Sequence, residues 1–299
     1  MMIEPLLPEV KRLAIFMSGS GTNAMRIIER YIQDKKEGTV SFEPVLMFTD
    51  NPKSSARHIA EQMYKDQGFT CQYVWNPLVD KAMKDRPAYD EVQRGLLNTR
   101  GIDMIALAGY DWVVTSAICD NFVVANVHPG DLRRLDDAGK KAYRGLAWVP
   151  SAKAIMAGEN EVYTTVHLVT TELDGGPILG RSVPVKVQDY ILGLEDRTVL
   201  LGEATQRLGE GFKMEKLQRL IDDAKIGNED AAKMFPIVGY AKECQESLKR
   251  LGDWVVFPQV VSWIAQGRYG RNTNGAICFD GIPKPEGVRF GIDKFVNER

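Results

Sequence analysis

Two side chains with complementary chemistry, Asn126 and His128, stand two positions apart where an apolar run ends. In extended backbone, residues two apart point to the same side, so the amide and the imidazole are expected side by side. An amide N–H can stabilise a developing oxyanion, and an imidazole titrates near neutral pH and can move protons. The pair predicts a site for acyl transfer.

A carboxylate that could complete this site is Asp174. It precedes two glycines and a proline in Thr171–Ile178, TELDGGPI, and that composition predicts a tight turn that holds the side chain in place. Asp174 is therefore the expected third member beside Asn126 and His128. Two interpretations remain open for His167, which falls inside a strand-like pattern: a side chain satisfied within the sheet, or a supporting contact next to the site.

The elements that must position these residues alternate between strand and helix patterns. Such alternation predicts an α/β fold, a Rossmann-like, doubly wound and mostly parallel sheet, whose ligands collect beyond the carboxyl ends of the strands. The segments 18–23, 110–114 and 126–130 are therefore expected to converge at one edge. Strands are predicted at Leu13–Met17, Pro44–Thr49, Thr70–Trp75, Ile102–Ala108, Phe122–Ala125 and Tyr163–Thr170, and helices at Ala24–Gln33, Ser54–Gln67, Tyr89–Arg100 and Ser151–Gly158.

The glycine-rich segment Ser18–Asn23, SGSGTN, lies between the first predicted strand and helix. Backbone amides at a helix start, together with nearby hydroxyl groups, favour a phosphate. Gly19, Gly21 and Ala24 also fit the dinucleotide pattern GxGxxA, with Asp50 at the end of the next strand as a ribose ligand. A purely structural turn is the third alternative.

Composition narrows the class of partner. The formal net charge of -2 gives no general attraction to nucleic acid or to anionic membranes, so a small-molecule substrate is expected. Acidic residues and prolines interrupt the first residues, and no apolar run has the length of a membrane span, which predicts a soluble cytoplasmic protein. Of the three histidines, His58 falls in a polar helical segment and is expected at the surface. No metal site is predicted, because the cysteines Cys71, Cys119, Cys244 and Cys278 are far apart.

Four motifs, SGSGTN, ALAGY, NVHPG and TVHLVTTELDGGPI, occur in this order, and VVFPQVVSWIAQGR and GAICFDGIPKPEGV follow towards the end. The set resembles the 10-formyltetrahydrofolate-dependent formyltransferases over about residues 12–186 and 239–288. The resemblance implies an enzyme that uses 10-formyltetrahydrofolate as co-substrate and needs no metal. The acceptor it implies is a phosphorylated amine, glycinamide ribonucleotide of purine synthesis.

The same resemblance implies roles for individual residues. Asn126, His128 and Asp174 match the catalytic trio of the family. The acceptor phosphate is expected at Gly19, Ser20, Gly21, Thr22 and Asn23, with Arg250 as a further ligand, and the rest of the acceptor at Pro129 and Asp253. The folate is expected at Trp112, Val113, Val114, Val169, Thr170 and Thr171, with His167 as a supporting residue.

The chain departs from the family pattern in three places. The His-Pro pair is followed by Gly130–Leu132 and a basic loop that carries Arg133, Arg134, Lys140, Lys141 and Arg144. ALAGY is followed by Asp111 and Trp112. An extra segment spans about 187–238. Helices are predicted in that segment at Leu192–Leu208 and Met214–Ala224, inside one catalytic domain over 1–299. Three roles fit it: a dimerisation element, which leaves a homodimer open, a lid, or an element of specificity.

Other functions with the same residues are a formyltransferase for sugar nucleotides or for initiator methionyl-tRNA, a formyltetrahydrofolate hydrolase, and a nucleotide-binding module without activity. The near-neutral charge disfavours tRNA. A regulatory domain is not expected before residue 12, which disfavours the hydrolase. All three catalytic positions are present, which disfavours the module.

Overall fold

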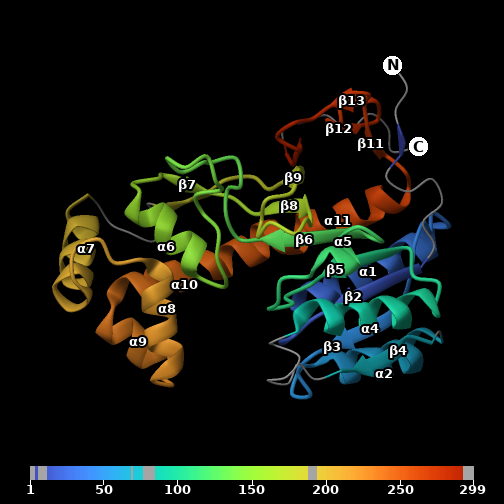
Figure 1. The fold of residues 1–299 in the computed structure, drawn as a ribbon, viewed down its shortest axis with the longest axis horizontal. Helices are drawn as coiled ribbons and strands as arrows, with labels where there is room; N and C mark the ends of the chain where they lie inside the picture. The colour runs from blue at the N-terminus through green and yellow to red at the C-terminus, as the bar shows by residue number, and fades with distance from the viewer. Residues whose placement is uncertain (1–3, 6–11, 69, 77–84, 188–193, 292–299) are drawn as a thin grey trace. The chain divides into compact units, whose positions relative to one another are not determined.

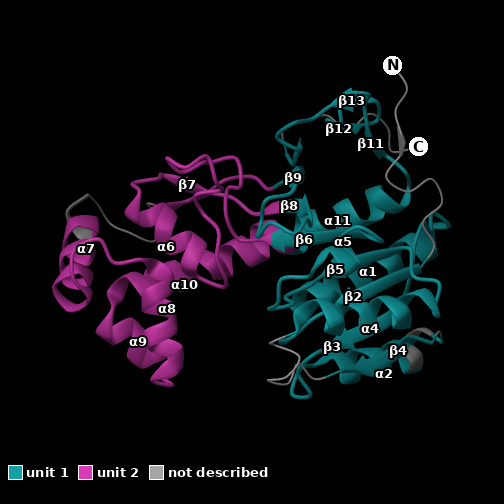
Figure 2. Cartoon of the chain, viewed as in Figure 1, with its two compact units in different colours: residues 1–127, 166–181, 254–299 teal, residues 128–165, 182–253 magenta. Residues whose placement is uncertain are grey.

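The computed structural model describes the chain except for residues 1–3, 6–11, 69, 77–84, 188–193 and 292–299. The described chain forms two compact units (Figure 2). The first contains residues 1–127, 166–181 and 254–299, and the second contains residues 128–165 and 182–253. The second unit therefore includes more of the chain than the expected extra segment at about 187–238.

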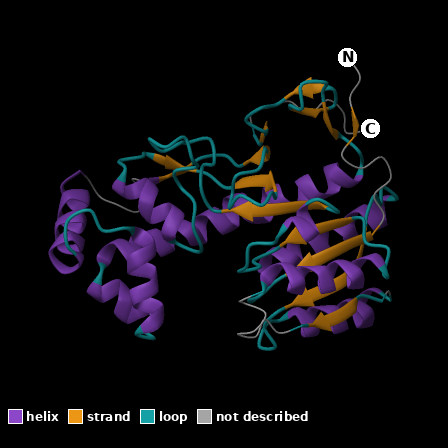
Figure 3. Cartoon of the chain, viewed as in Figure 1, coloured by secondary structure: helices purple, strands orange, loops and turns teal. Residues whose placement is uncertain are grey.

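The first unit is built on a sheet that, in the described residues, has eight strands in the order β14-β9-β8-β6-β5-β2-β3-β4 (Figures 1 and 3). β2 pairs in parallel with both β3 and β5, and β5 pairs in parallel with β6. The order reverses at β2, as expected for a doubly wound sheet. The strands are β2 (Arg12–Phe16), β3 (Glu43–Thr49), β4 (Gln72–Trp75), β5 (Met104–Leu107), β6 (Val123–His128), β8 (Thr165–Leu168), β9 (Ile178–Arg181) and β14 (Val288–Arg289).

Helices cover both faces of this sheet. Leu13 and Ile15 of β2 join the apolar cluster of α1, α2 and α11, whereas Ala14 and Phe16 join the cluster of α4 and α5. Because alternate residues of β2 are buried on opposite faces, the strand has the continuous apolar run that the sequence shows. The helices are α1 (Thr22–Glu37), α2 (Ala56–Gln67), α4 (Arg86–Asn98), α5 (Ser116–Cys119) and α11 (Trp254–Ala265).

A smaller antiparallel sheet also belongs to the first unit. Its strands pair in the order β1-β11-β12-β13, so the beginning of the chain pairs with a segment near its end. The strands are β1 (Glu4–Pro5), β11 (Tyr269–Arg271), β12 (Ile277–Phe279) and β13 (Ile282–Pro283).

The second unit is mainly helical and has its own apolar core. Leu200 of α7 and Leu217 and Ile221 of α8 are buried in this core, so the extra segment packs against its own unit. The elements are α6 (Val149–Met156), α7 (Leu194–Leu208), α8 (Met214–Asp223), α9 (Asn228–Met234), α10 (Pro236–Leu248), a π-helical turn η2 (Lys249–Asp253) and the paired strands β7 (Glu161–Val162) and β10 (Val185–Lys186).

The strands and helices predicted from the sequence are present in the structure, but they begin or end at residues that differ from the predicted bounds. The strand expected at Phe122–Ala125 continues to His128 because Asn126 still pairs with Leu107 of β5. The two helices expected in the extra segment are present as α7 and α8, although residues 192–193 lie outside the described residues. α9 and α10 were not expected. In the described part of the chain, no helix combines the length and the apolar character needed to cross a bilayer.

Candidate active site

Asn126 and His167 meet across two neighbouring strands of the first unit, β6 and β8. The Asn126 Nδ2 atom lies 3.3 Å from Nε2 of His167, whose side chain is 2% exposed. The other ring nitrogen, Nδ1, lies 2.8 Å from the carbonyl oxygen of Leu168. Because a carbonyl only accepts, Nδ1 carries the proton, and Nε2 of the neutral ring accepts from the Asn126 amide.

Asp174 reaches the same imidazole. Its Oδ1 atom lies 3.6 Å from Nε2 of His167, and the residue is 7% exposed. Its backbone has a φ of 53°, a left-handed conformation that aspartate adopts more readily than most residues. A Cβ at Gly176 would lie 1.7 Å from the Leu168 carbonyl oxygen, so only glycine allows the loop to approach β8 this closely. The carboxylate is therefore held in place by its turn.

Nε2 of His167 thus faces a donor and an acceptor at once. The neutral ring can accept a hydrogen bond from Asn126, and the protonated ring can donate to the Asp174 carboxylate. An amide, an imidazole and a carboxylate are the groups that oxyanion stabilisation and proton transfer require. From the sequence, His167 was expected as a supporting residue. In the structure it contacts Asn126 and Asp174, two of the three residues expected to be catalytic. The sequence does not reveal that β8 lies beside β6, so it could not predict these contacts.

His128, the last residue of β6, begins the second unit. Its Nε2 atom lies 2.6 Å from the carbonyl oxygen of Tyr143, and the side chain is 3% exposed. Nε2 therefore carries a proton, and the neutral ring has its lone pair on Nδ1. A Cβ at Gly130 would lie 2.8 Å from both Nε2 and the Tyr143 carbonyl oxygen, so glycine is required where this contact forms.

The glycine-rich segment lies where the strand order reverses. The backbone N–H of Ser18 donates to the Gly109 carbonyl at 2.8 Å, which joins the ends of β2 and β5 as expected. Gly19, Ser20 and Thr22 are exposed, and Asn23 is half-buried. Gly21, with a φ of 74°, caps α1 without a side-chain hydrogen bond. The first-turn N–H groups of α1 are thus suited to an anion.

Asp50 belongs to a hydrogen-bond network within the first unit. One carboxylate oxygen accepts from the Ser18 hydroxyl at 2.6 Å, and the other accepts from the indole N–H of Trp112 at 2.7 Å. The backbone N–H of Asp111 donates to the Ser18 hydroxyl oxygen at 3.1 Å. Both oxygens of Asp50 thus bind protein groups, which ties the end of β3 to Ser18 and Trp112.

Three of the residues expected at the folate share one apolar cluster. Val114, 1% exposed, is part of it, and the partly buried Trp112 and Val169 pack against it. Val114 is therefore a buried core residue. Val113 is 45% exposed, Thr170 is half-buried and Thr171 is exposed.

The residues expected at the acceptor lie in the second unit. Asp253, 5% exposed, accepts at Oδ1 from the Thr164 hydroxyl at 2.7 Å, and a Cβ at Gly252 would lie 2.2 Å from the same hydroxyl oxygen. Arg250, in the same π-helical turn, is exposed, and Pro129 is half-buried. Thr164 is a residue that the sequence did not single out.

Comparison with known proteins identifies the family. Residues 11–204 match the family described as Formyl transferase, which is more than half of the chain. This chain belongs to the formyl transferase family. The phosphoribosylglycinamide formyltransferase of Haemophilus influenzae is 29% identical to this formyl transferase over 192 residues, which cover 63% of this chain and 80% of that protein. The enzyme of the same name from Bacillus subtilis is 24% identical over 191 residues and covers 63% of this chain and 87% of that protein.

Solved structures share the fold of this formyl transferase. The phosphoribosylglycinamide formyltransferase of Coxiella burnetii aligns with a TM-score of 0.57 at 18% identity and covers 94% of this chain and 100% of that chain. Glycinamide ribonucleotide transformylase 1 of Symbiobacterium toebii aligns with a TM-score of 0.54 at 20% identity and covers 91% of this chain and 95% of that chain. The mostly parallel sheet with flanking helices is therefore the formyltransferase fold.

Proposed function

We propose that this formyl transferase moves the formyl group of 10-formyltetrahydrofolate to the primary amine of glycinamide ribonucleotide. The observation that carries most weight is the cluster at the end of β6 in which the half-buried Asn126 and the buried Asp174 both lie beside the buried His167. The family match and the names of the relatives support the acceptor. A phosphorylated small molecule also suits the start of α1, which has no side-chain cap and whose first-turn N–H groups favour an anion.

The proposed reaction is an acyl transfer between two nitrogen atoms. The acceptor amine attacks the formyl carbon, a C–N bond forms, and the carbonyl π electrons become an oxyanion. The Asn126 amide donates a hydrogen bond to that oxyanion. As the carbonyl re-forms, the bond from carbon to N10 of the folate breaks, and the proton lost by the amine reaches N10. The products are the formylated acceptor and tetrahydrofolate.

His128 and Asp174 serve the proton transfer in this mechanism. His128 lies two residues after Asn126 on β6, and its Nδ1 lone pair in the neutral ring can accept the amine proton. The Asp174 carboxylate, 3.6 Å from Nε2 of His167, stabilises positive charge on that imidazole. His167 orients the Asn126 amide, since its Nε2 atom lies 3.3 Å from the amide nitrogen.

The substrates take the places that the sequence implies. The acceptor phosphate binds at Gly19, Ser20, Gly21, Thr22 and Asn23, with Arg250 as a further ligand. The rest of the acceptor contacts Pro129 and Asp253. The folate contacts Trp112, Val113, Val114, Val169, Thr170 and Thr171. In this proposal the whole chain works as one catalytic domain in the cytoplasm, and the reaction requires no metal, nucleic acid or membrane.

An assay with 10-formyltetrahydrofolate tests the proposal. Tetrahydrofolate should form rapidly when glycinamide ribonucleotide is added, with one formylated acceptor for each folate consumed. Turnover only with an amino sugar nucleotide or with methionyl-tRNA would replace the acceptor. Release of formate without any amine would indicate the hydrolase, and folate binding without turnover would indicate the binding module.

A further inference from the structure

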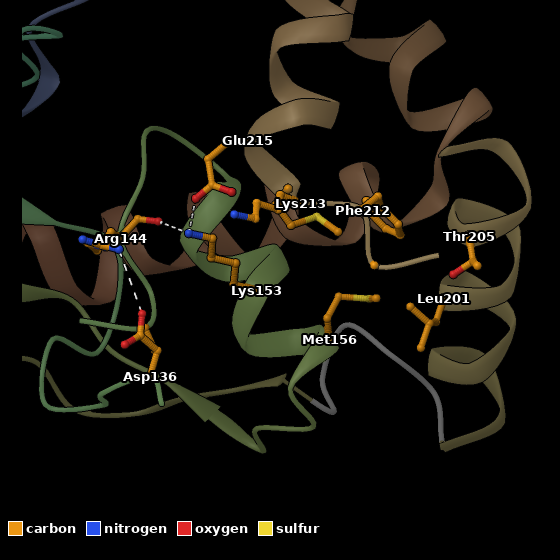
Figure 4. A pocket seen from close by; sticks show the side chains of 12 residues that line it. Asp136, Arg144, Lys153, Met156, Leu201, Thr205, Phe212, Lys213 and Glu215 are labelled. Atoms are coloured by element: carbon orange, nitrogen blue, oxygen red, sulfur yellow. Dashed lines mark hydrogen bonds and ion pairs between the residues drawn. The ribbon is translucent and has the colours of Figure 1, made fainter. Parts of the chain in front are cut away.

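Two places in which the chain departs from the family pattern, the basic loop and the extra segment, meet at one lysine of the second unit. Lys153 of α6 donates to the carbonyl oxygen of Arg144, at the end of the loop, at 2.7 Å. The same ammonium group forms an ion pair with Glu215 in the first turn of α8 (Figure 4). Lys153 thus links the extra segment to the loop on one wall of a pocket of about 420 Å³.

The residue before Arg144 is the one that contacts His128. The carbonyl oxygen of Tyr143 lies 2.6 Å from Nε2 of His128, and the Tyr143 hydroxyl donates to Glu159 at 2.7 Å. Lys153 therefore holds one peptide carbonyl, and His128 contacts the carbonyl of the peptide immediately before it. The two peptide planes share the Cα atom of Arg144, and the close packing at Gly130 and Gly145 limits the rotation that would let one plane move without the other.

Close packing at two glycines, Gly145 and Gly130, restricts the backbone around Tyr143 and Arg144. Gly145 has a φ of 133°, which strongly favours glycine, and a Cβ there would lie 2.9 Å from Val149. At Gly130 a Cβ would lie 2.8 Å from the His128 ring nitrogen. The Tyr143 carbonyl thus packs closely against His128 beside Gly130, and Gly145, two residues further along, packs closely against Val149.

We propose that Lys153 is a positioning residue for His128. It fixes the Arg144 carbonyl, and Glu215 of the extra segment fixes Lys153, so the extra segment sets the tautomer and orientation of His128. The inference rests on the proposed role of His128 in formyl transfer. It gives the extra segment a part in the reaction although none of the proposed catalytic residues, Asn126, His128 and Asp174, lies in it.

The test compares Lys153→Met, Lys153→Arg and Glu215→Gln. A matched control is Lys242→Met, because Lys242 of α10 donates to Asn228 of α9 at 2.6 Å in the same unit, through a contact that does not involve the loop. The chain has three histidines, so heteronuclear NMR can follow each imidazole separately once single-histidine variants assign the signals. Turnover with 10-formyltetrahydrofolate and glycinamide ribonucleotide is measured in parallel.

In Lys153→Met, His128 should no longer prefer the Nε2–H tautomer over the Nδ1–H tautomer, whereas the NMR signal of His58 should not change. The kcat should fall about tenfold to a hundredfold, with little change in KM for the folate. Glu215→Gln should show a smaller change in the same direction. Lys153→Arg should restore most of the tautomer preference of His128 and most of kcat, and Lys242→Met should change neither quantity. An unchanged His128 signal in a folded Lys153→Met or Glu215→Gln variant overturns the inference. The NMR result stands even if the natural protein shows no formyl transfer, which would instead refute the proposed function.

Discussion

The two buried histidines are held in opposite tautomers, one in each unit. In the first unit, Nδ1 of His167 donates to the Leu168 carbonyl, and Nε2 faces Asn126 and Asp174. In the second unit, Nε2 of His128 donates to the Tyr143 carbonyl. The same residue type therefore presents Nε2 as the acceptor in one unit and Nδ1 in the other. The backbone carbonyl that each ring meets makes the difference.

The source of that carbonyl also differs. Leu168 is the residue after His167 on its own strand, so its carbonyl comes with β8 of the family sheet. Tyr143 belongs to the basic loop after β6, in which a departure from the family pattern is expected from the sequence. The first histidine is thus fixed by its own strand, and the second is fixed by a loop carbonyl 15 residues away in the sequence. Substitutions should therefore affect the two rings separately.

The largest effect is expected for Asp174→Asn. The variant keeps the shape of the turn but loses the negative charge beside His167, so turnover should fall by about 10²-fold to 10⁴-fold while the folate still binds. Steady-state kinetics and equilibrium folate binding measure the two quantities. Asp280→Asn is a matched control, because Asp280 also has a left-handed backbone, with a φ of 47°, and pairs with Arg268. Near-natural turnover in Asp174→Asn would remove Asp174 from the mechanism.

Asn126→Ala should rank second. Loss of one oxyanion donor commonly lowers kcat by about 10²-fold to 10³-fold, and His167 would also lose its amide partner. The imidazole signal of His167 should change in the same variant. Asn121→Ala, which removes an amide that donates to the Ala117 carbonyl at 3.0 Å, is the control. An Asn126→Ala enzyme with natural kcat would exclude the amide as the oxyanion donor.

The sequence predicted the parts of the site that depend on local patterns. The apolar runs predicted the strands, and TELDGGPI predicted a tight turn at Asp174. ALAGY and SGSGTN were expected at one edge of the sheet, and a hydrogen bond from Ser18 to Gly109 joins them where the strand order reverses. It could not predict that Leu168 and Tyr143 supply the carbonyls for the two rings. Those contacts depend on strand order and on the path of a loop, neither of which leaves a periodic pattern in the residues.

Gly176→Ala tests the fixed tautomer in the first unit. The new Cβ would lie 1.7 Å from the Leu168 carbonyl oxygen, which is the atom that holds Nδ1 of His167. The loop or the carbonyl must move, so we expect a loss of about 2–3 kcal/mol in the free energy of unfolding and a mixed tautomer at His167. Chemical denaturation and NMR measure these effects. Gly95→Ala, on α4 with open space around its Cα, should not destabilise the protein. A Gly176→Ala protein of natural stability would mean that the loop is not closely packed.

Trp112→Phe tests a polar network of the first unit whose hydrogen bonds involve neither histidine. It removes the indole N–H that donates to Asp50 at 2.7 Å and leaves the Ser18 contact. A hydrogen bond to a charged group contributes about 1.5–3 kcal/mol, so the free energy of unfolding should fall by about that amount. Trp75→Phe, at a side chain that is 48% exposed, is the control and should change little. Equal effects of the two substitutions would show that the Asp50 contact adds no stability.

The smallest effect is expected for Glu215→Gln in the second unit. Burial alone would raise the pKa of Glu215, but hydrogen bonds from Lys153 and its own N–H and the charges of Lys153 and Lys213 lower the pKa below its ordinary value of 4.5. Because the folded pKa lies below the unfolded one, the carboxylate stabilises the folded protein above its ordinary pKa, and this stabilisation is lost as the pH falls through the lowered pKa.

Glu215→Gln should therefore be less stable than the natural protein near neutral pH, by at most about 1 kcal/mol for a pair with this much solvent exposure, and the difference should close in acid. Denaturant unfolding across this pH range measures the difference. Glu229→Gln, at an exposed position in the first turn of α9, controls for charge at a helix start. A difference that persisted in acid would mean that Glu215 acts through packing. The extra segment would then hold Lys153 by shape rather than by charge.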